Sequence, residues 1–149
     1  MSMSMECKMP YEREIQTNLK RLTRDKELSD VIFQVGPLNN YELIYGIRSL
    51  FAVQSPVFRS MLIGERFIES IKQHNNRVII SDVTPESFKY LRNTFYSVKQ
   101  SLKPSIVVDV LYLSQKYLVS SLEMKCLNYI KEIKGLKSFA IILKKFETQ

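Results

Sequence analysis

The first part of the chain changes from a helical to a strand-like spacing of hydrophobic residues. The charged stretch 11–26 is predicted to be an exposed helix, because its apolar residues are spaced four and three apart, namely Ile15, Leu19 and Leu22. The run "DVIFQV" at 30–35 is β-branched and aromatic and predicts a strand, as does "YELIY" at 41–45. The turn-forming stretch "GPLNN" lies between these runs, so we expect a hairpin.

The next apolar stretch, "RSLFAVQSPVFRSMLIGERFIES" at 48–70, is interrupted by Ser55-Pro56. Serine is a favoured helix cap, and proline fits the first helical position without losing a hydrogen bond. The pattern therefore predicts two short helices in place of one kinked helix. The second runs from about Pro56 to Ile63 and ends at Gly64, which can take a left-handed conformation. It carries more apolar side chains than one helix face needs.

The second half of the chain is mainly helical. "VII" at 78–80 predicts a short strand, and Thr84-Pro85 repeats the cap-then-proline start of a helix. Ser105 is expected to cap a nearly all-apolar, central helix, and Ser120–Glu123 has the pattern of a capping box that opens the last helix. The order is a helix, a hairpin, two helices, a strand and three helices. This predicts an α+β fold, a small mixed sheet capped by a cluster of short helices.

Composition fits one globular domain, with 45% hydrophobic and 25% charged residues in a chain of 149. The two cysteines, Cys7 and Cys126, lie far apart and imply no disulfide framework, so we expect an intracellular protein, cytoplasmic or nuclear. The chain has no run of about 18 apolar residues, and no membrane span is expected. The net charge of +7 is scattered among acidic residues, which favours a solvated basic surface over a nucleic-acid face.

Candidate chemistry is sparse. His74 is the chain's one histidine and lies in the polar stretch "KQHNN", where a surface role is expected. One histidine and two distant cysteines cannot make a metal site or a histidine-based nucleophile relay. The four glycines form no phosphate-binding loop. We therefore expect a binding module without a cofactor and without enzymatic activity.

Four blocks in order resemble the BTB/POZ domain family, over about 105 residues. They are "LSDVIFQV" at 28–35, "RSLFAVQSPVFRSML" at 48–62, "ISDVTPESFKYLRNTFYS" at 80–97 and "VLYLSQKYLVSSLEMKCLNYI" at 110–130. Two departures are Ile47-Arg48, where the family often has histidine before the basic residue, and Tyr96-Ser97-Val98, where it often has Tyr-Thr-Gly. The tail "LKSFAIILKKF" at 136–146 resembles the beginning of the BACK helices that often follow.

The resemblance implies a domain organisation and an assembly. The first residues, "MSMSMECKMP", have no apolar core and are expected to be a disordered lead-in at 1–10. The resemblance implies an N-terminal helical arm at 11–26, a BTB/POZ domain at 27–133 and a C-terminal helical stub at 134–149. In dimeric members the arm packs against its twin, which implies a homodimer interface at Ile15, Leu19, Leu22, Leu50 and Phe51. The family's acidic and basic pair is retained as Asp30 and Arg48, either as an ion pair that fixes hairpin to helix or as a charged pocket that recognises a ligand.

Members of this family that recruit cullin-3 to a ubiquitin ligase do so with the helix after the Ser-Pro break, the loop beyond it and the end of the Phe-x-Tyr helix. The resemblance implies that cullin would be bound here by Phe58, Met61, Leu62, Phe67, Glu69 and Tyr96. Phe67-Ile68-Glu69 matches the apolar-x-acidic pattern of such adaptors, although Phe67 could instead fold under the loop as core. The expected partners are a second copy, cullin-3 and an unidentified substrate protein. The alternative is an oligomerisation module that binds no cullin.

Overall fold

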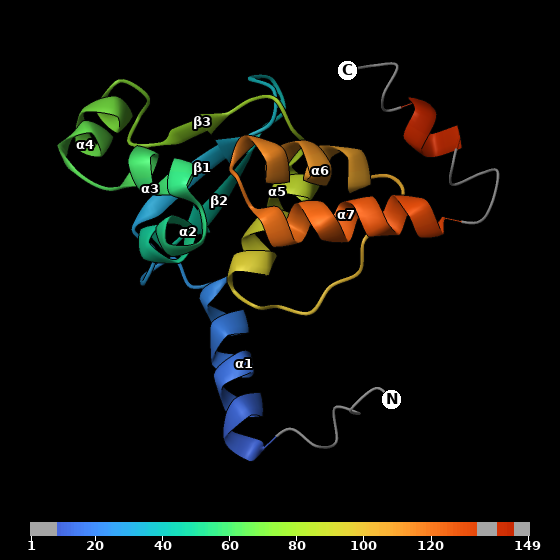
Figure 1. The fold of residues 1–149 in the computed structure, drawn as a ribbon. Coiled ribbons are helices and arrows are strands. Elements are labelled where there is room, and N and C mark those ends of the chain that lie inside the picture. Colours follow the sequence, from blue (N-terminus) through green and yellow to red (C-terminus); the bar gives the residue numbers. More distant parts are fainter. Residues whose placement is uncertain (1–8, 134–139, 145–149) are drawn as a thin grey trace.

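The computed structural model describes residues 9–133 and 140–144. A three-stranded sheet lies at its centre, with the strand order β2-β1-β3 (Figure 1). β1 (Val31–Val35) pairs antiparallel with β2 (Glu42–Gly46) on one side and parallel with β3 (Val78–Ile80) on the other. The sheet is therefore mixed. The predicted hairpin and the α+β fold class are confirmed.

Short helices surround this sheet. Their bounds are α1 (Pro10–Leu22), α2 (Arg48–Gln54), α3 (Pro56–Leu62), α4 (Glu65–Lys72), α5 (Pro85–Phe95), α6 (Val107–Lys116) and α7 (Ser120–Glu132). α6 packs against α5 and α7, and α2 packs against α3 and α5. α1 projects away from the rest of the fold (Figure 1). The helices thus form a cluster on the sheet, with one helix that stands apart.

Aromatic rings fill the core between the sheet and the helices. The ring centroid of Phe33 on β1 lies 4.9 Å from that of Phe51 on α2 and 4.9 Å from that of Phe88 on α5. Phe58 on α3 stacks on Tyr117 with 4.0 Å between the ring centroids. All five side chains are buried. Large rings bury much apolar surface per residue, which lets short elements share one core.

The Ser-Pro break starts a second helix, as predicted. The Ser55 hydroxyl oxygen accepts a 3.1 Å hydrogen bond from the backbone N–H of Phe58, and Pro56 occupies the first turn of α3. The same hydroxyl donates a 2.6 Å bond to the carbonyl oxygen of Tyr117. Ser55 is buried, so one side chain caps α3 and ties it to the end of α6. Thr84 caps α5 in the same way, through the backbone N–H of Ser87.

Two predicted caps were wrong. α6 follows Ile106 and α7 follows Val119, and neither helix start has a side-chain cap bond, so Ser105 and the Ser120–Glu123 box do not cap them. The turn between these helices is made by the backbone. Leu118 has a φ of +56°, and the N–H of Val119 bonds to a carbonyl in the last turn of α6 at 2.8 Å. The chain therefore enters α7 without needing serine at the cap.

The helix α4, between Gly64 and β3, was not predicted from the sequence. Gly64 has a positive φ, of +98°, as expected for the end of α3. However, the C-cap of α3 is Ile63, and Gly64 is the N-cap residue of α4. A glycine can make this abrupt change of direction without steric strain. The polar stretch after α4 then turns through Asn75 and Asn76, which also have positive φ.

The predicted ends of the chain are described only in part. The arm is α1, which ends at Leu22 and not at residue 26. Most of the lead-in at 1–10 lies outside the described residues. Of the C-terminal stub at 134–149, the structure describes 140–144, which is helical and has Ile142 buried in the core.

Candidate protein-interaction surface

The predicted charged pair forms where the hairpin meets α2. Asp30 accepts a 2.7 Å hydrogen bond from the backbone N–H of Arg48 and a 3.3 Å bond from the Arg48 side-chain Nε. The carboxylate thereby satisfies an N–H group of the first turn of α2 that has no partner within the helix. Both side chains are partly exposed to solvent. This geometry favours the ion pair that fixes hairpin to helix, which was one of the two roles expected for it.

Arg48 also fastens the edge formed by α3 and α4. Its Nη1 donates a 2.9 Å hydrogen bond to the carbonyl oxygen of Leu62, the last residue of α3. Its guanidinium lies over the ring of Phe67, with 4.7 Å from Cζ to the ring centroid. A guanidinium can make such a stacked contact while it also donates hydrogen bonds. Arg48 therefore links Asp30, the residue before β1, with α3 and α4 through one side chain.

Most of the predicted cullin-binding side chains lie inside the molecule. Phe58 and Leu62 are fully buried, and Phe67 on the inner side of α4 is only 5% exposed. Tyr96 is fully buried, and its hydroxyl accepts a 2.8 Å hydrogen bond from the backbone N–H of Ile47. Burial raises the pKa of the Tyr96 phenol above its ordinary value. In this conformation these four residues hold the fold together, and of the two roles considered for Phe67 the core role is the one observed.

Other side chains of the same edge face solvent. Ile68 is 53% exposed on α4, and Ile63 is half exposed between α3 and α4. Glu69 is exposed beside Ile68, and Met61 is partly buried. An apolar centre with charged neighbours is a usual composition for a transient protein interface. The edge can contact a partner through these residues, two of which, Ile63 and Ile68, were not among the predicted site residues.

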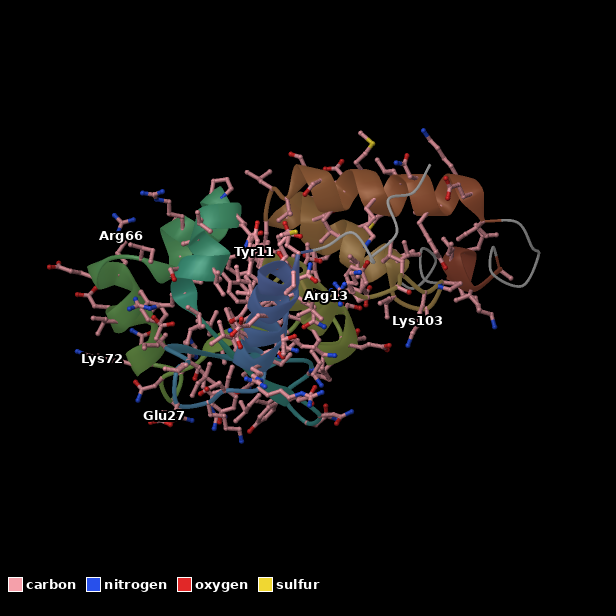
Figure 2. All side chains as sticks on the ribbon, turned by 90° about the horizontal axis from the view of Figure 1, so that it is seen from below. Tyr11, Arg13, Glu27, Arg66, Lys72 and Lys103 are labelled. Atoms are coloured by element: carbon pink, nitrogen blue, oxygen red, sulfur yellow. The ribbon has the colours of Figure 1, made fainter. Side chains whose placement is uncertain are left out.

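The arm carries its apolar stripe into solvent. α1 has no buried residue, and Ile15 is 54% exposed. Tyr11 adds one more turn to the stripe at its free end, while Leu19 and Leu22 are partly buried near the body. Figure 2 looks onto this free end, with Tyr11 and Arg13 labelled. Exposed apolar residues gathered on one face of an amphipathic helix are typical of a protein-interaction surface.

The two predicted interface residues on α2 differ in accessibility. Leu50 is partly buried, whereas Phe51 is fully buried in the aromatic core and cannot touch a partner in this conformation. Val53 on the same helix is 74% exposed. Phe51 faces inward because α2 packs on α3 and α5. Val53 is thus the apolar side chain that α2 offers to solvent.

A polar cluster on α6 was missed by the sequence analysis. The hydroxyl of Tyr112 and the ammonium of Lys116 both donate to Asp82 Oδ2, at 2.5 and 2.7 Å. Burial acts to raise the pKa of Asp82, but the hydrogen bonds from Lys116 and Tyr112 lower it overall. The hydrogen bond to Asp82 raises the pKa of Tyr112. The spacing of Tyr112 and Lys116, one helical turn apart, was the available signal, but their shared partner lies 30 residues before Tyr112.

Within the described ranges, no three histidine, cysteine or acidic side chains gather as metal ligands do. No helix in the same ranges is both long and apolar enough to cross a membrane. His74 lies on the surface, in the stretch between α4 and β3.

Comparison with known proteins identifies the family to which this chain belongs. Residues 19–134 match the model of the BTB/POZ domain. The chain belongs to the BTB/POZ domain family. This BTB domain is 29% identical over 119 residues to BTB/POZ domain-containing protein 6-A of Danio rerio, a match that covers 80% of the chain and 21% of that protein. It is 28% identical over 116 residues to BTB/POZ domain-containing protein 3 of Homo sapiens, covering 78% and 21%.

The fold resembles that of the BTB domain of zebrafish PATZ1. The TM-score is 0.61 at 18% sequence identity, and the match covers 83% of this chain and 93% of that one. The predicted BTB/POZ fold is confirmed, and BTB domains are protein-interaction modules that commonly self-associate. The chain spans about a fifth of the length of the curated relatives it matches. The predicted resemblance of the tail to BACK helices has no support among these matches.

Proposed function

We propose that this BTB domain is an assembly module that pairs with a second copy of itself through α1. The observation that carries the proposal is the exposed apolar stripe of a helix that stands apart from the body, with Ile15 at its middle. Fully burying a side chain of this size is worth about 1.5–3 kcal/mol. Pairing with the α1 of the second copy, and with α2 near Leu50 and Val53, would cover the stripe.

Light scattering on the size-separated chain tests this proposal. The wild type should have at least the mass of a dimer, and Ile15→Asp should lose the association that α1 gives and so have a lower mass at the same concentration. Thr17→Asp is the matched control, because it adds the same charge to α1 on the face opposite the stripe, where Thr17 is exposed. A wild-type monomer, or equal masses for both variants, would contradict pairing through α1.

A second candidate function is recruitment of cullin-3, as a substrate-adaptor subunit of a ubiquitin ligase. It is supported by the exposed apolar Ile68 with Glu69 beside it, at the α3–α4 edge. The substrate protein would bind elsewhere. A BTB module that assembles without cullin is the alternative, and it needs no partner at this edge.

Calorimetry with the N-terminal domain of cullin-3 separates these alternatives. If the edge is the binding site, Ile68→Asp should abolish the heat of binding without changing the melting temperature. Leu38→Asp is the control, since Leu38 is an exposed apolar residue in the loop between β1 and β2. Absence of wild-type binding at tens of micromolar leaves the dimer proposal intact and rejects the adaptor.

A further inference from the structure

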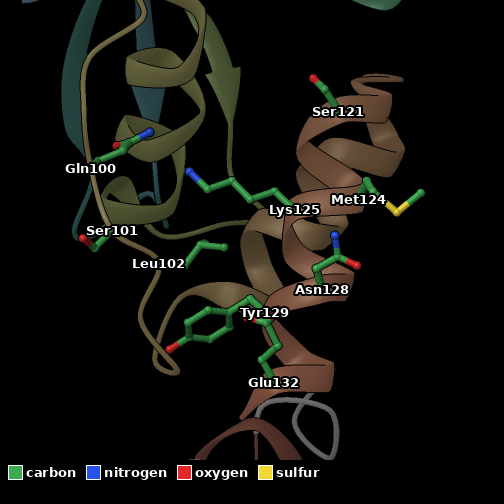
Figure 3. Close-up of a pocket in the computed structure, with 9 residues that line it drawn as sticks. All are labelled: Gln100, Ser101, Leu102, Ser121, Met124, Lys125, Asn128, Tyr129 and Glu132. Carbon is green, nitrogen blue, oxygen red and sulfur yellow. The ribbon is translucent and has the colours of Figure 1, made fainter. Parts of the chain in front are cut away.

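A groove of about 490 Å³ runs along α7, on a part of the molecule that neither proposed interface uses. One wall is α7, and the other is the extended segment between α5 and α6 (Figure 3). Leu102 from this segment and Tyr129 from α7 reach into it, and Met124 and Asn128 lie along the helix side. Met124 is 58% exposed. The groove therefore combines an accessible apolar side chain with polar groups.

One end of this groove carries a positive side chain and the other end a negative one. Lys125 and Glu132 both line it, and they lie seven residues apart on α7. Two turns of helix put them on one face, about 10 Å apart along the axis. The Lys125 ammonium lies over the ring of Tyr90, at 5.4 Å from its centroid. Neither Lys125 nor Glu132 forms an ion pair with any other residue that the structure describes.

A helix face with a positive and a negative end is complementary to a copy of itself placed in the opposite direction. A two-fold axis between Asn128 and Tyr129 puts Lys125 opposite the Glu132 position of the second copy, and Glu132 opposite its Lys125 position. The same axis puts Asn128 opposite the Tyr129 position. In a two-fold contact every interaction occurs twice, so one lysine and one glutamate per chain supply two ion pairs. Antiparallel helices also place opposite ends of their backbone dipoles together.

We propose that α7 is a second self-association surface, in which the α7 helices of two copies pack antiparallel along this groove. The occupant is a second copy because both charges of the groove are matched by the groove itself. An acidic or a basic partner would match one end and repel the other. Since α1 and α7 lie on different sides of the fold, both contacts can form in one molecule (Figure 1). Where α1 also pairs, the two contacts together link dimers into chains.

Sedimentation velocity of the full chain over a range of concentrations tests the α7 contact. The mean mass of the wild type should rise with concentration beyond the species that α1 pairing gives. In Lys125→Glu, both ion pairs become carboxylate pairs, and in Glu132→Lys both become ammonium pairs. Each variant alone should associate through α7 at least about tenfold more weakly. Both positions are exposed, so Glu132→Lys should leave the melting temperature unchanged. Lys125→Glu loses the contact of the ammonium with the Tyr90 ring and should lower the melting temperature only slightly.

Mixing the two variants provides the decisive measurement. In a one-to-one mixture, the glutamate introduced by Lys125→Glu faces the lysine introduced by Glu132→Lys, and the unchanged Glu132 of the first variant faces the unchanged Lys125 of the second. Association should return to within about threefold of the wild type. The double variant Lys125→Glu/Glu132→Lys should associate by itself for the same reason. A mixture that stays as weak as its components, or single variants that associate like the wild type, would overturn the proposal.

The same experiment distinguishes the two self-contacts. If α1 does not pair, the wild type should change from monomer to dimer through α7 alone, and Lys125→Glu should remove that dimer. If α1 pairs and α7 does not, Ile15→Asp should give a monomer at every concentration. A wild type whose mass is independent of concentration contradicts the α7 contact whatever the state of α1.

Discussion

Replacing Phe67 with alanine should destabilise this BTB domain, whereas replacing its neighbour Ile68 should not. Phe67 is 5% exposed and lies under the Arg48 guanidinium, so its removal leaves a hole between α4 and the body. Ile68 is the next residue of the same helix and is 53% exposed. The two substitutions thus remove apolar side chains one residue apart, one from the core and one from the surface.

The magnitudes follow from burial. A Phe→Ala change in a core costs about 3–5 kcal/mol of unfolding free energy, and loss of the guanidinium contact adds about 0.5–1 kcal/mol. α4 lies at the edge of the fold and can partly close the hole, which reduces the cost. We therefore expect about 3 kcal/mol for Phe67→Ala. For Ile68→Ala we expect a change within about 0.5 kcal/mol, because it is a surface substitution and alanine has the higher helix propensity.

Urea unfolding at one fixed protein concentration measures both effects. With a slope of about 1.5–2 kcal/mol per molar urea, Phe67→Ala should lower the midpoint by about 1.5–2 M. Ile68→Ala should keep the wild-type midpoint. Equal midpoints for the two variants would show that Phe67 is not part of the core in solution. Such a result would return Phe67 to the candidate partner surface.

Four further predictions concern buried polar groups. Ser55→Ala removes both the cap of α3 and the bond to the Tyr117 carbonyl, and should lower the unfolding free energy by about 1–2 kcal/mol in urea titrations. Among the described residues, the Tyr90 hydroxyl is buried without a hydrogen-bond partner, so Tyr90→Phe should be neutral or slightly stabilising. By contrast, Tyr96→Phe should lower the unfolding free energy by about 1–2 kcal/mol, because it leaves the Ile47 N–H unpaired. Equal effects of the two substitutions would contradict the conclusion that only the Tyr96 hydroxyl has a hydrogen-bond partner. Burial raises the pKa of Tyr117 to about 12, so the unfolded chain ionises first, and the stabilisation held below about pH 10 is lost as the pH rises toward 12. Tyr117→Phe should reduce this loss, measured as unfolding free energy against pH.

Local signals in the sequence were sufficient for much of the fold. Ser55-Pro56 and Thr84-Pro85 predicted two helix starts because a capping side chain and a fixed φ act on adjacent residues. The hairpin followed from two β-branched runs with a turn between them. In each case the residues that determine the structure are neighbours in the chain. Such features can be predicted before any tertiary contact is known.

Features set by distant residues could not be predicted in this way. The Ser120–Glu123 pattern is a normal capping box, but the turn before α7 is closed by the backbone at Leu118. The arrangement of Asp82 with Tyr112 and Lys116 depends on how the loop before α5 packs against α6. These outcomes require knowledge of which segments meet in space.

Burial of individual residues was the least predictable property of the candidate site. Phe67, Ile68 and Glu69 were grouped as one motif because they are adjacent in sequence. On a helix, successive side chains point about 100° apart, so adjacent residues cannot all face one partner or all face the core. The contact with Arg48 fixes which of the three turns inward, and the other two are then directed to solvent. A motif of this kind can therefore serve the fold and a partner at once, with Phe67 anchoring the helix that presents Ile68 and Glu69.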